Sequence, residues 1–194
     1  MPANQTRSPT RRTDAERNRE KIITVARAAF AKPEAEVSMA EISRRAGVGM
    51  ATLYRNFPGR RELLEALYSE EVDVICRAPE TPAGQTPGES LVSWLRQLFV
   101  FFASKRQIAS ELLKHTDSSD PVFGGGRARV IAAGRPLLAA AQQAREIRSD
   151  LTIEQVLDLI HSIATIDGDT GYVQPILQAA LDGMRPRASL QGRC

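Results

Sequence analysis

One stretch rich in helix-breaking residues constrains the fold of this chain more than any other. Residues 47–60 read GVGMATLYRNFPGR, so a short segment beginning at Met50 lies between two glycines and a Phe-Pro-Gly breaker. Just before it, Ser38 and Glu41 have the spacing of a capping box, which predicts a helix start. Gly47 supplies the positive-φ residue that ends such a helix. Two short helices, ending near residues 46 and 56, are therefore predicted around a glycine turn, which is the pattern of a helix-turn-helix.

Longer helices are predicted on both sides of this motif. Thr13 as N-cap and Glu16 at N3 predict a first helix from residue 14 to about 31, ended by Pro33. A linking helix is predicted over residues 60–76. The stretch 78–88, APETPAGQTPG, has three prolines and two glycines and is predicted to be a loop.

The remainder of the chain also has helical periodicity. Apolar spacing predicts one helix over residues 91–102 and a second over 108–113. We then predict a loop through the GGG at 124–126, followed by helices over 130–144, 152–166 and 174–184. Pro136 is expected to kink the helix over 130–144. Thr152 and Gln155 are expected to cap the helix over 152–166, and Pro175 to lie in the first turn of the helix over 174–184.

This pattern contains no strand-type alternation, so the fold class is all-α. We expect a disordered basic arm over 1–13, a three-helix helix-turn-helix domain over 14–60, and a second helical domain over 61–194.

Charge is unevenly distributed between these parts. Residues 1–61 hold 13 Lys/Arg against six Asp/Glu, a net charge of +7, whereas residues 62–194 hold 13 against 17, a net charge of −4. An excess of positive charge in the first third of the chain indicates a domain that binds a polyanion, here double-stranded DNA. No long uncharged apolar run and no signal segment occur, so we expect a cytoplasmic protein without a membrane partner.

The polar residues of the motif have physical reasons to meet DNA. Thr52, Tyr54 and Arg55 would face the major groove, which admits a helix. Ser38 and Arg60 stand at helix N-termini, where free N–H groups favour phosphate. A helix–glycine–helix corner also occurs in bundles that do not touch DNA. The alternative is thus an all-α ligand-binding or protein-interaction module without sequence-specific DNA binding.

The segment SMAEISRRAGVGMATLYRNFPGRRELL resembles the TetR family of bacterial transcriptional regulators, over residues 17 to about 68. Further along, SWLRQLF, AREIRSDLT and LDGMRPR resemble the regulatory domains of the SbtR-like type. The resemblance implies that residues 14–60 are a DNA-binding domain and that residues 61–194 are a ligand-binding and dimerisation domain. It implies a homodimer that binds a palindromic operator. It also implies a repressor that is released by a small molecule, here an unknown effector.

The same resemblance implies a set of DNA-binding residues, carried over by position: Ser38, Arg44, Arg45, Gly49, Met50, Ala51, Thr52, Tyr54, Arg55, Asn56 and Arg60. Three positions depart from the family pattern. Gly49 replaces the usual Ser or Thr cap, Asn56 stands where His or Tyr is common, and the loop before the second helix carries Pro33. Met50 and Ala51 offer only apolar contacts, such as with a thymine methyl group.

Two further sets are expected in the C-terminal domain. Ligand-binding candidates come from an aromatic and leucine cluster that is also compatible with ordinary core packing: Trp94, Leu98, Phe101, Phe102, Leu112, Phe123 and His161. Dimer-interface candidates come from the last two predicted helices: Leu157, Ile160, Ala164, Ile176, Ala180 and Met184.

Enzyme chemistry is not indicated. The carboxylates of HTDSSD (115–120) and DGDTG (167–171) lack the spacing of a calcium loop, and Cys76 and Cys194 have no zinc-type spacing. Nucleotide fingerprints and nucleophile motifs are missing as well. We expect no catalytic residues, no metal and no cofactor.

Overall fold

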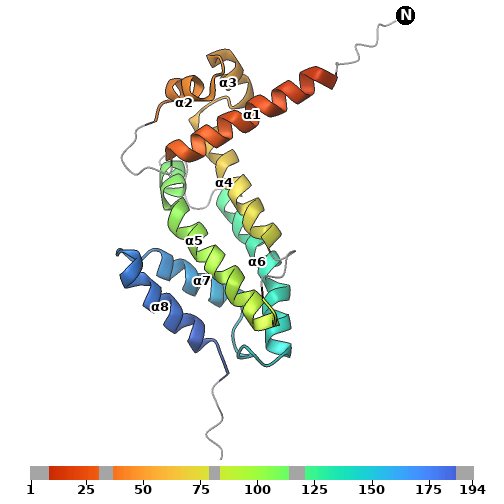
Figure 1. Ribbon diagram of the computed structural model, residues 1–194, viewed down its shortest axis with the longest axis vertical. Coiled ribbons are helices and arrows are strands. Elements are labelled where there is room, and N and C mark those ends of the chain that lie inside the picture. The colour runs from red at the N-terminus through yellow and green to blue at the C-terminus, as the bar shows by residue number, and fades with distance from the viewer. Residues whose placement is uncertain (1–8, 31–36, 79–83, 114–120, 187–194) are drawn as a thin grey trace, which may run out of the picture. The chain divides into compact units, whose positions relative to one another are not determined.

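All regular structure in the described part of the chain is helical. The computed structural model describes residues 9–30, 37–78, 84–113 and 121–186 (Figure 1). In chain order the helices are α1 Pro9–Phe30, α2 Met39–Ala46, α3 Met50–Asn56, α4 Arg60–Arg77, α5 Pro87–Leu113, α6 Pro121–Gln143, α7 Ile153–Ala164 and α8 Thr170–Gly183. The all-α prediction is confirmed.

The chain divides into two compact units. Residues 1–68 and 107–117 form the first unit, and residues 69–106 and 118–194 form the second. The division therefore falls inside α4 and α5. The boundary at residue 60 that we expected from the sequence stays a prediction, with residues 61–68 grouped beside α1–α3.

The first unit is a small three-helix arrangement whose helices α1, α2 and α3 contact one another in pairs. From α1, Ile22, Ala26 and Phe30 are buried, at the helical spacing that the sequence suggested. Leu53 of α3 is fully buried, and so is Phe57 just after it. These two buried side chains attach α3, a helix of seven residues, to the core. Its other side chains are not needed for core packing.

The first helix begins earlier than predicted. It starts at Pro9, so Thr13 lies inside α1 and is not its N-cap, and residues 9–13 are not part of a disordered arm. Proline is favoured in the first helical turn because its fixed φ suits the helix and its missing N–H has no intrahelical partner there. Residues 1–8 and Pro33 lie outside the described residues.

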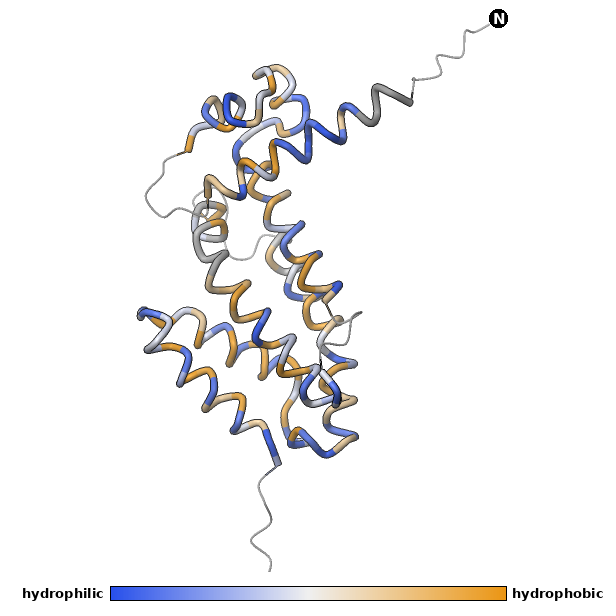
Figure 2. The backbone as a smooth tube through the Cα atoms, in the orientation of Figure 1, coloured by the Kyte–Doolittle hydropathy of each residue, from blue (hydrophilic) through white to orange (hydrophobic). Residues whose placement is uncertain are grey.

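In the second unit, α6 contacts α7 and α7 contacts α8. Hydrophobic and hydrophilic residues alternate along α7 and α8 (Figure 2). The buried side includes Val156, Ile160 and Ile163 of α7 and Leu177 and Leu181 of α8. Thr152 forms the predicted capping box, since its hydroxyl accepts from the Gln155 N–H at 3.3 Å and the Gln155 side chain accepts from the Thr152 N–H at 3.0 Å.

The predicted loop at 78–88 is shorter than expected, and the two helices predicted after it are one. Pro87 and Gly88 are the first residues of α5, which continues to Leu113. Thr86 and Glu89 supply a capping box that the sequence analysis missed, with the Glu89 N–H bonded to Thr86 Oγ1 and the Thr86 N–H to Glu89 Oε2, both at 3.2 Å. No Pro or Gly follows Gly88 before residue 113, so nothing breaks the helix.

Two other helix starts were also placed too late. α6 begins at Pro121 and runs through the three glycines, each of which is only about 1 kcal/mol less favourable than alanine in a helix. α8 begins at Thr170, where Asp169 accepts from the Tyr172 N–H at 2.9 Å. Pro175 therefore lies inside α8, and the carbonyl its ring faces one turn earlier belongs to Gly171. No helix within the described ranges is long and apolar enough to cross a membrane.

Candidate nucleic-acid interface

Ser38 and Gly47 define the two ends of α2 as predicted. The Ser38 hydroxyl accepts from the Glu41 N–H at 3.2 Å. Gly47 adopts φ 64°, and its N–H bonds to the Arg44 carbonyl at 3.3 Å. The Glu41 side chain does not complete the capping box at Ser38; it accepts from Arg44 and Arg45 instead.

A buried serine secures the turn between α2 and α3. Ser43 is only 4% exposed, and its hydroxyl donates to the Val48 carbonyl at 2.6 Å. The Val48 N–H returns to the Ser43 carbonyl at 3.1 Å. The sequence analysis missed Ser43; the available signal was a serine on the inward side of α2, next to Ile42.

The outward side of α3 carries the side chains predicted to read DNA. Gly49 is the N-cap, and no side chain caps the helix there. Met50 and Tyr54 are 39% and 46% exposed, Ala51 and Arg55 are exposed, and Thr52 is half-buried. With Leu53 and Phe57 buried, the helix therefore presents these residues on its solvent side; their contacts with DNA remain a prediction.

Arg55, Thr52 and Asn56 are joined by hydrogen bonds along α3. Arg55 donates from Nε to the Ala51 carbonyl at 3.1 Å and from Nη2 to Thr52 Oγ1 at 3.0 Å. Asn56 donates from Nδ2 to the Thr52 carbonyl at 2.8 Å. Asn56 therefore stabilises α3 through this bond, and its predicted contact with DNA stays a prediction.

Arg44 and Arg45 are exposed and share one carboxylate. Glu41 accepts from Arg44 Nη2 and from Arg45 Nε, both at 2.6 Å. The hydrogen bonds from Arg44, and next those from Arg45, lower the pKa of Glu41 to about 2. The three side chains carry a net charge of +1 on the solvent side of α2.

Arg60 begins α4, as predicted, and its side chain has partners within the protein, while its contact with a DNA phosphate stays a prediction. It is half-buried at the start of α4, donates from Nη1 to the Val37 carbonyl, and places its guanidinium 4.9 Å from the centre of the Phe30 ring. Through these contacts Arg60 joins Phe30, the last residue of α1, to Val37, which precedes α2. Arg19 of α1 covers Phe57 in the same way at 4.7 Å, a contact the sequence analysis did not foresee.

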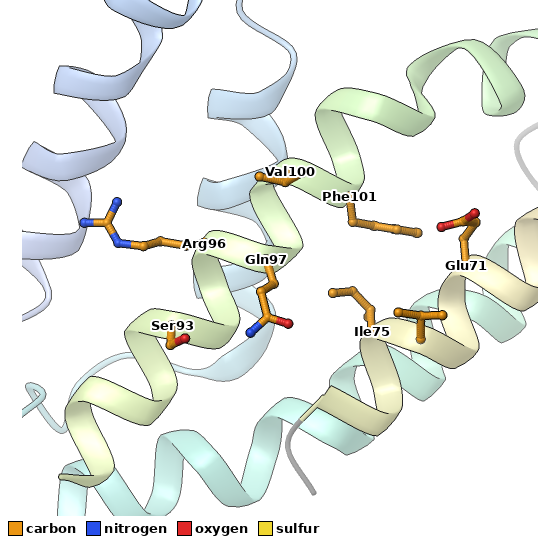
Figure 3. Close-up of a pocket in the computed structure, with 8 residues that line it drawn as sticks. Glu71, Ile75, Ser93, Arg96, Gln97, Val100 and Phe101 are labelled. Carbon is orange, nitrogen blue, oxygen red and sulfur yellow. The ribbon is translucent and has the colours of Figure 1, made fainter. Parts of the chain in front are cut away.

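In the second unit, a groove of about 480 Å³ lies between α4 and α5 (Figure 3). Phe101 of α5 and Ile75 of α4 face each other across it, with Glu71 at the same end, whereas Arg96 points to the other side of α5. The remaining lining residues are Val74, Ser93, Gln97 and Val100. A wider cleft of about 650 Å³ shares Ser93 and Arg96 and includes Thr86, Glu146 and Arg185.

Of the seven ligand candidates, one residue lines either of these two grooves. Phe101 lines the groove between α4 and α5, but Trp94 and Leu98 are core residues. A methyl group at Gly134 would lie 2.5 Å from Trp94 Cη2, so the indole fills its space closely. Its Nε1 donates to the Ile75 carbonyl at 3.1 Å.

Phe102 is a neighbour of Phe101, with ring centres 5.4 Å apart. Phe102 stacks edge-on against His161 with ring centres 4.9 Å apart, and His161 is exposed. Phe123 is half-buried on α6. Leu112 is fully buried in the first unit and belongs with a different set of neighbours. Trp94, Leu98 and Leu112 fit ordinary core packing, and the ligand-binding role of the set stays a prediction.

Most of the predicted dimer residues face the core of their own chain. Leu157, Ile160 and Ala164 are buried at 2%, 0% and 6% exposure, and Met184 at 1%. Only Ile176 and Ala180 are half-exposed. The apolar stripe of α7 packs within the unit, so the outer side of α7 and α8 presents other residues: Gln155, Asp158, Leu159, Ser162, Tyr172, Gln178 and Ala179.

No cluster of three or more metal-binding side chains occurs among the residues described, and 115–120 lie outside them. Cys76 is half-buried, and this burial raises the pKa of its thiol. A thiol of raised pKa is a poor nucleophile.

Two family models match the chain. A model described as bacterial regulatory proteins of the tetR family matches residues 22–67. A model described as the C-terminal domain of SbtR-like transcriptional regulators matches residues 86–186. No curated protein matches the chain.

Solved structures resemble it along most of its length. A TetR transcriptional regulator from Streptomyces coelicolor is 33% identical, with a TM-score of 0.72 over 88% of this chain and 99% of its own. A TetR regulatory protein from Mycobacterium vanbaalenii is 31% identical, with the same TM-score over 90% and 99%. FadR from Bacillus subtilis, solved with stearoyl-CoA, is 17% identical with a TM-score of 0.61 over 86% and 99%, which shows a shared fold alone.

Proposed function

Because the chain belongs to the TetR family of bacterial regulatory proteins, we propose that it represses transcription as a homodimer that leaves a palindromic operator when a small molecule binds. Its membership makes it a DNA-binding transcriptional regulator with an SbtR-like C-terminal domain. The repressor action, the homodimer, the effector and a cytoplasmic location belong to the proposal, and we assign it no catalytic reaction.

The observation that carries the proposal is the outward face of α3. A helix of seven residues held by Leu53 and Phe57 leaves Met50, Thr52 and Arg55 on its solvent side. The first turns of a recognition helix contact base edges in the major groove. Arg55 and Thr52 supply hydrogen-bonding groups there, while Met50 and Ala51 supply apolar contacts suited to thymine methyl groups.

The exposed side of α7 and α8 supports the homodimer. Leu159 is 40% exposed and Tyr172 is 62% exposed, which leaves two large apolar surfaces on neighbouring helices. The small Ala179 on α8 would let a partner helix approach closely. These residues replace the four buried ones, Leu157, Ile160, Ala164 and Met184, as the proposed interface.

The groove between α4 and α5 supports an effector site in the second unit. Its walls combine apolar side chains, including Ile75 and Phe101, with the polar Glu71 and Gln97. Ligand sites commonly have this mixture of a largely apolar lining and a few polar groups.

Selection from a pool of random DNA duplexes tests this function. We expect the purified chain to enrich a palindrome whose half-sites are about 34–36 Å apart, or a multiple of this spacing. Affinity for that duplex should exceed affinity for its scrambled version and should fall steeply with salt. Without an enriched sequence, the rival interpretation of an all-α module that does not read DNA would hold.

A further inference from the structure

One ion-pair network covers the solvent side of α2. Glu41 Oε2 accepts from Arg44 Nε at 2.8 Å. Glu41 Oε1 accepts from Arg44 Nη2 and from Arg45 Nε, both at 2.6 Å. A single carboxylate thus holds two guanidinium groups beside the turn that leads to α3.

The network is accessible to a macromolecule. The side chains of Arg44 and Arg45 are 73% and 48% exposed, and that of Glu41 is 28% exposed. Arg44 keeps Nη1 and Arg45 keeps both Nη atoms outside the three bonds to Glu41. A DNA phosphate can therefore approach the guanidinium groups while it is repelled by the carboxylate they share.

The carboxylate stays ionised wherever DNA binding is measured. The hydrogen bonds from Arg44 and Arg45 lower the pKa of Glu41 to about 2. At neutral pH the cluster therefore has two positive charges and one negative charge.

We propose that Glu41 determines how well this regulator discriminates its operator from random DNA. By pairing with both arginines, its carboxylate offsets one of their charges and fixes their guanidinium groups in one geometry. The inference rests on the proposed function, because it requires a chain that reads DNA sequence.

Random and operator DNA should respond differently to this arrangement. Binding to random DNA depends on the number of phosphates that basic side chains neutralise, so the negative charge of Glu41 weakens it directly. Operator binding also has base contacts that fix the register of the protein on the duplex. In a fixed register, arginines already held in place lose less conformational freedom when they meet their phosphates, and this gain offsets the repulsion.

The Glu41→Gln variant tests the proposal. The amide keeps the size of the side chain but removes its charge. With random duplex, we expect tighter binding and a log affinity against log salt slope steeper by about 0.9, or about 3.5-fold more affinity lost between 50 and 200 mM salt. With the selected operator the gain should be smaller, so the ratio of the two affinities falls by about threefold.

Glu65→Gln is a matched control on α4. Glu65 accepts from Arg61 Nε at 2.6 Å, and its side chain is 29% exposed, against 28% for Glu41, so the substitution removes the same charge at nearly the same exposure. It holds Arg61 four residues earlier, away from the Arg44–Arg45 pair. We expect Glu65→Gln to leave the affinity ratio within error of the wild type.

The combined variant Glu41→Gln/Arg45→Gln restores the net charge of the cluster. Its affinity for random duplex should return to the wild-type value, and thermal unfolding should confirm that all variants are folded. An unchanged ratio in Glu41→Gln, or an equal fall of the ratio in Glu65→Gln, would overturn the proposal. A wild-type chain that prefers no sequence would refute the proposed function instead.

Discussion

Arg55 and Thr52 act as a pair on α3. The Arg55 guanidinium is held at 3.0 Å by the Thr52 hydroxyl and at 3.1 Å from Nε to the Ala51 carbonyl. A side chain held in this way presents its remaining N–H donors in a narrow range of directions. The base that Arg55 contacts is therefore expected to depend on Thr52.

Substitution of the pair should show this dependence. Thr52→Ala and Arg55→Ala should each weaken operator binding by roughly 1–3 kcal/mol. Together they should cost less than the sum, because residues that share an interaction are not additive. Titration of all four proteins on one operator duplex measures the coupling, and strict additivity would mean that the two residues act independently.

Glu41 provides a prediction about pH. Its pKa in the folded protein, about 2, is below the ordinary value of 4.5. A lowered carboxylate pKa stabilises the folded state above pH 4.5, and that contribution is lost as the pH falls from 4.5 towards 2.

The difference in melting temperature between the wild type and Glu41→Gln should therefore shrink across this window. It should also shrink with added salt, because the network is exposed. Thermal unfolding followed by circular dichroism at several pH values measures the difference, and parallel curves from pH 6 to pH 2.5 would contradict the ion-pair geometry.

At the scale of elements, the turn between α2 and α3 depends on Ser43 and Gly47. Ser43 is buried and is bonded to the Val48 carbonyl, so Ser43→Ala leaves that carbonyl without its partner at a cost of about 1–3 kcal/mol. Gly47→Ala meets no atom within 4 Å, so its cost is the left-handed backbone alone, about 1–2 kcal/mol.

Denaturant unfolding of both variants checks these values. Ser43→Thr serves as a control that retains the hydroxyl. A stability equal to that of the wild type in Ser43→Ala would show that the 2.6 Å bond contributes nothing to the turn.

The elements around this turn could be predicted because their signals are local. Ser38 caps α2 through the N–H three residues later, and Gly47 ends it through its own backbone conformation. Helix starts set by proline were harder to place. Pro9, Pro87 and Pro121 each begin a helix that we had placed later in the chain. The same residue either interrupts a helix or begins one. Only the packing of the residues that follow the proline distinguishes the two cases.

The site was predictable to a different degree in each unit. Exposure of Met50, Tyr54 and Arg55 agrees with the expected outward face of α3. Arg60 does not face outward freely, because its contacts with Val37 and Phe30 join segments far apart in the sequence. Leu157 and Ile160 were predicted to contact a partner chain. An apolar stripe in a sequence does not reveal whether the same chain or another chain covers it.

At the scale of the whole molecule, the homodimer leads to a prediction about mass. Leu159→Lys on α7 places a charge on the exposed side that we propose as the interface. Burying that charge without a partner is costly, so the particle should change from twice the chain mass of 21.3 kDa to that mass alone.

Light scattering measures this change. Val74→Lys is the control, since Val74 is also an exposed aliphatic residue, at 55%, but lies on α4. Dissociation by both variants, or by neither, would argue against α7 and α8 as the interface.

We propose that α3 reads the operator through Thr52 and Arg55. Repeating the selection from random duplexes with Arg55→Ala and Thr52→Ala tests it most directly. We predict that each variant still enriches a palindrome with unchanged half-site spacing, but loses its preference at one position in each half-site. Enrichment of the wild-type sequence by both variants would contradict the account.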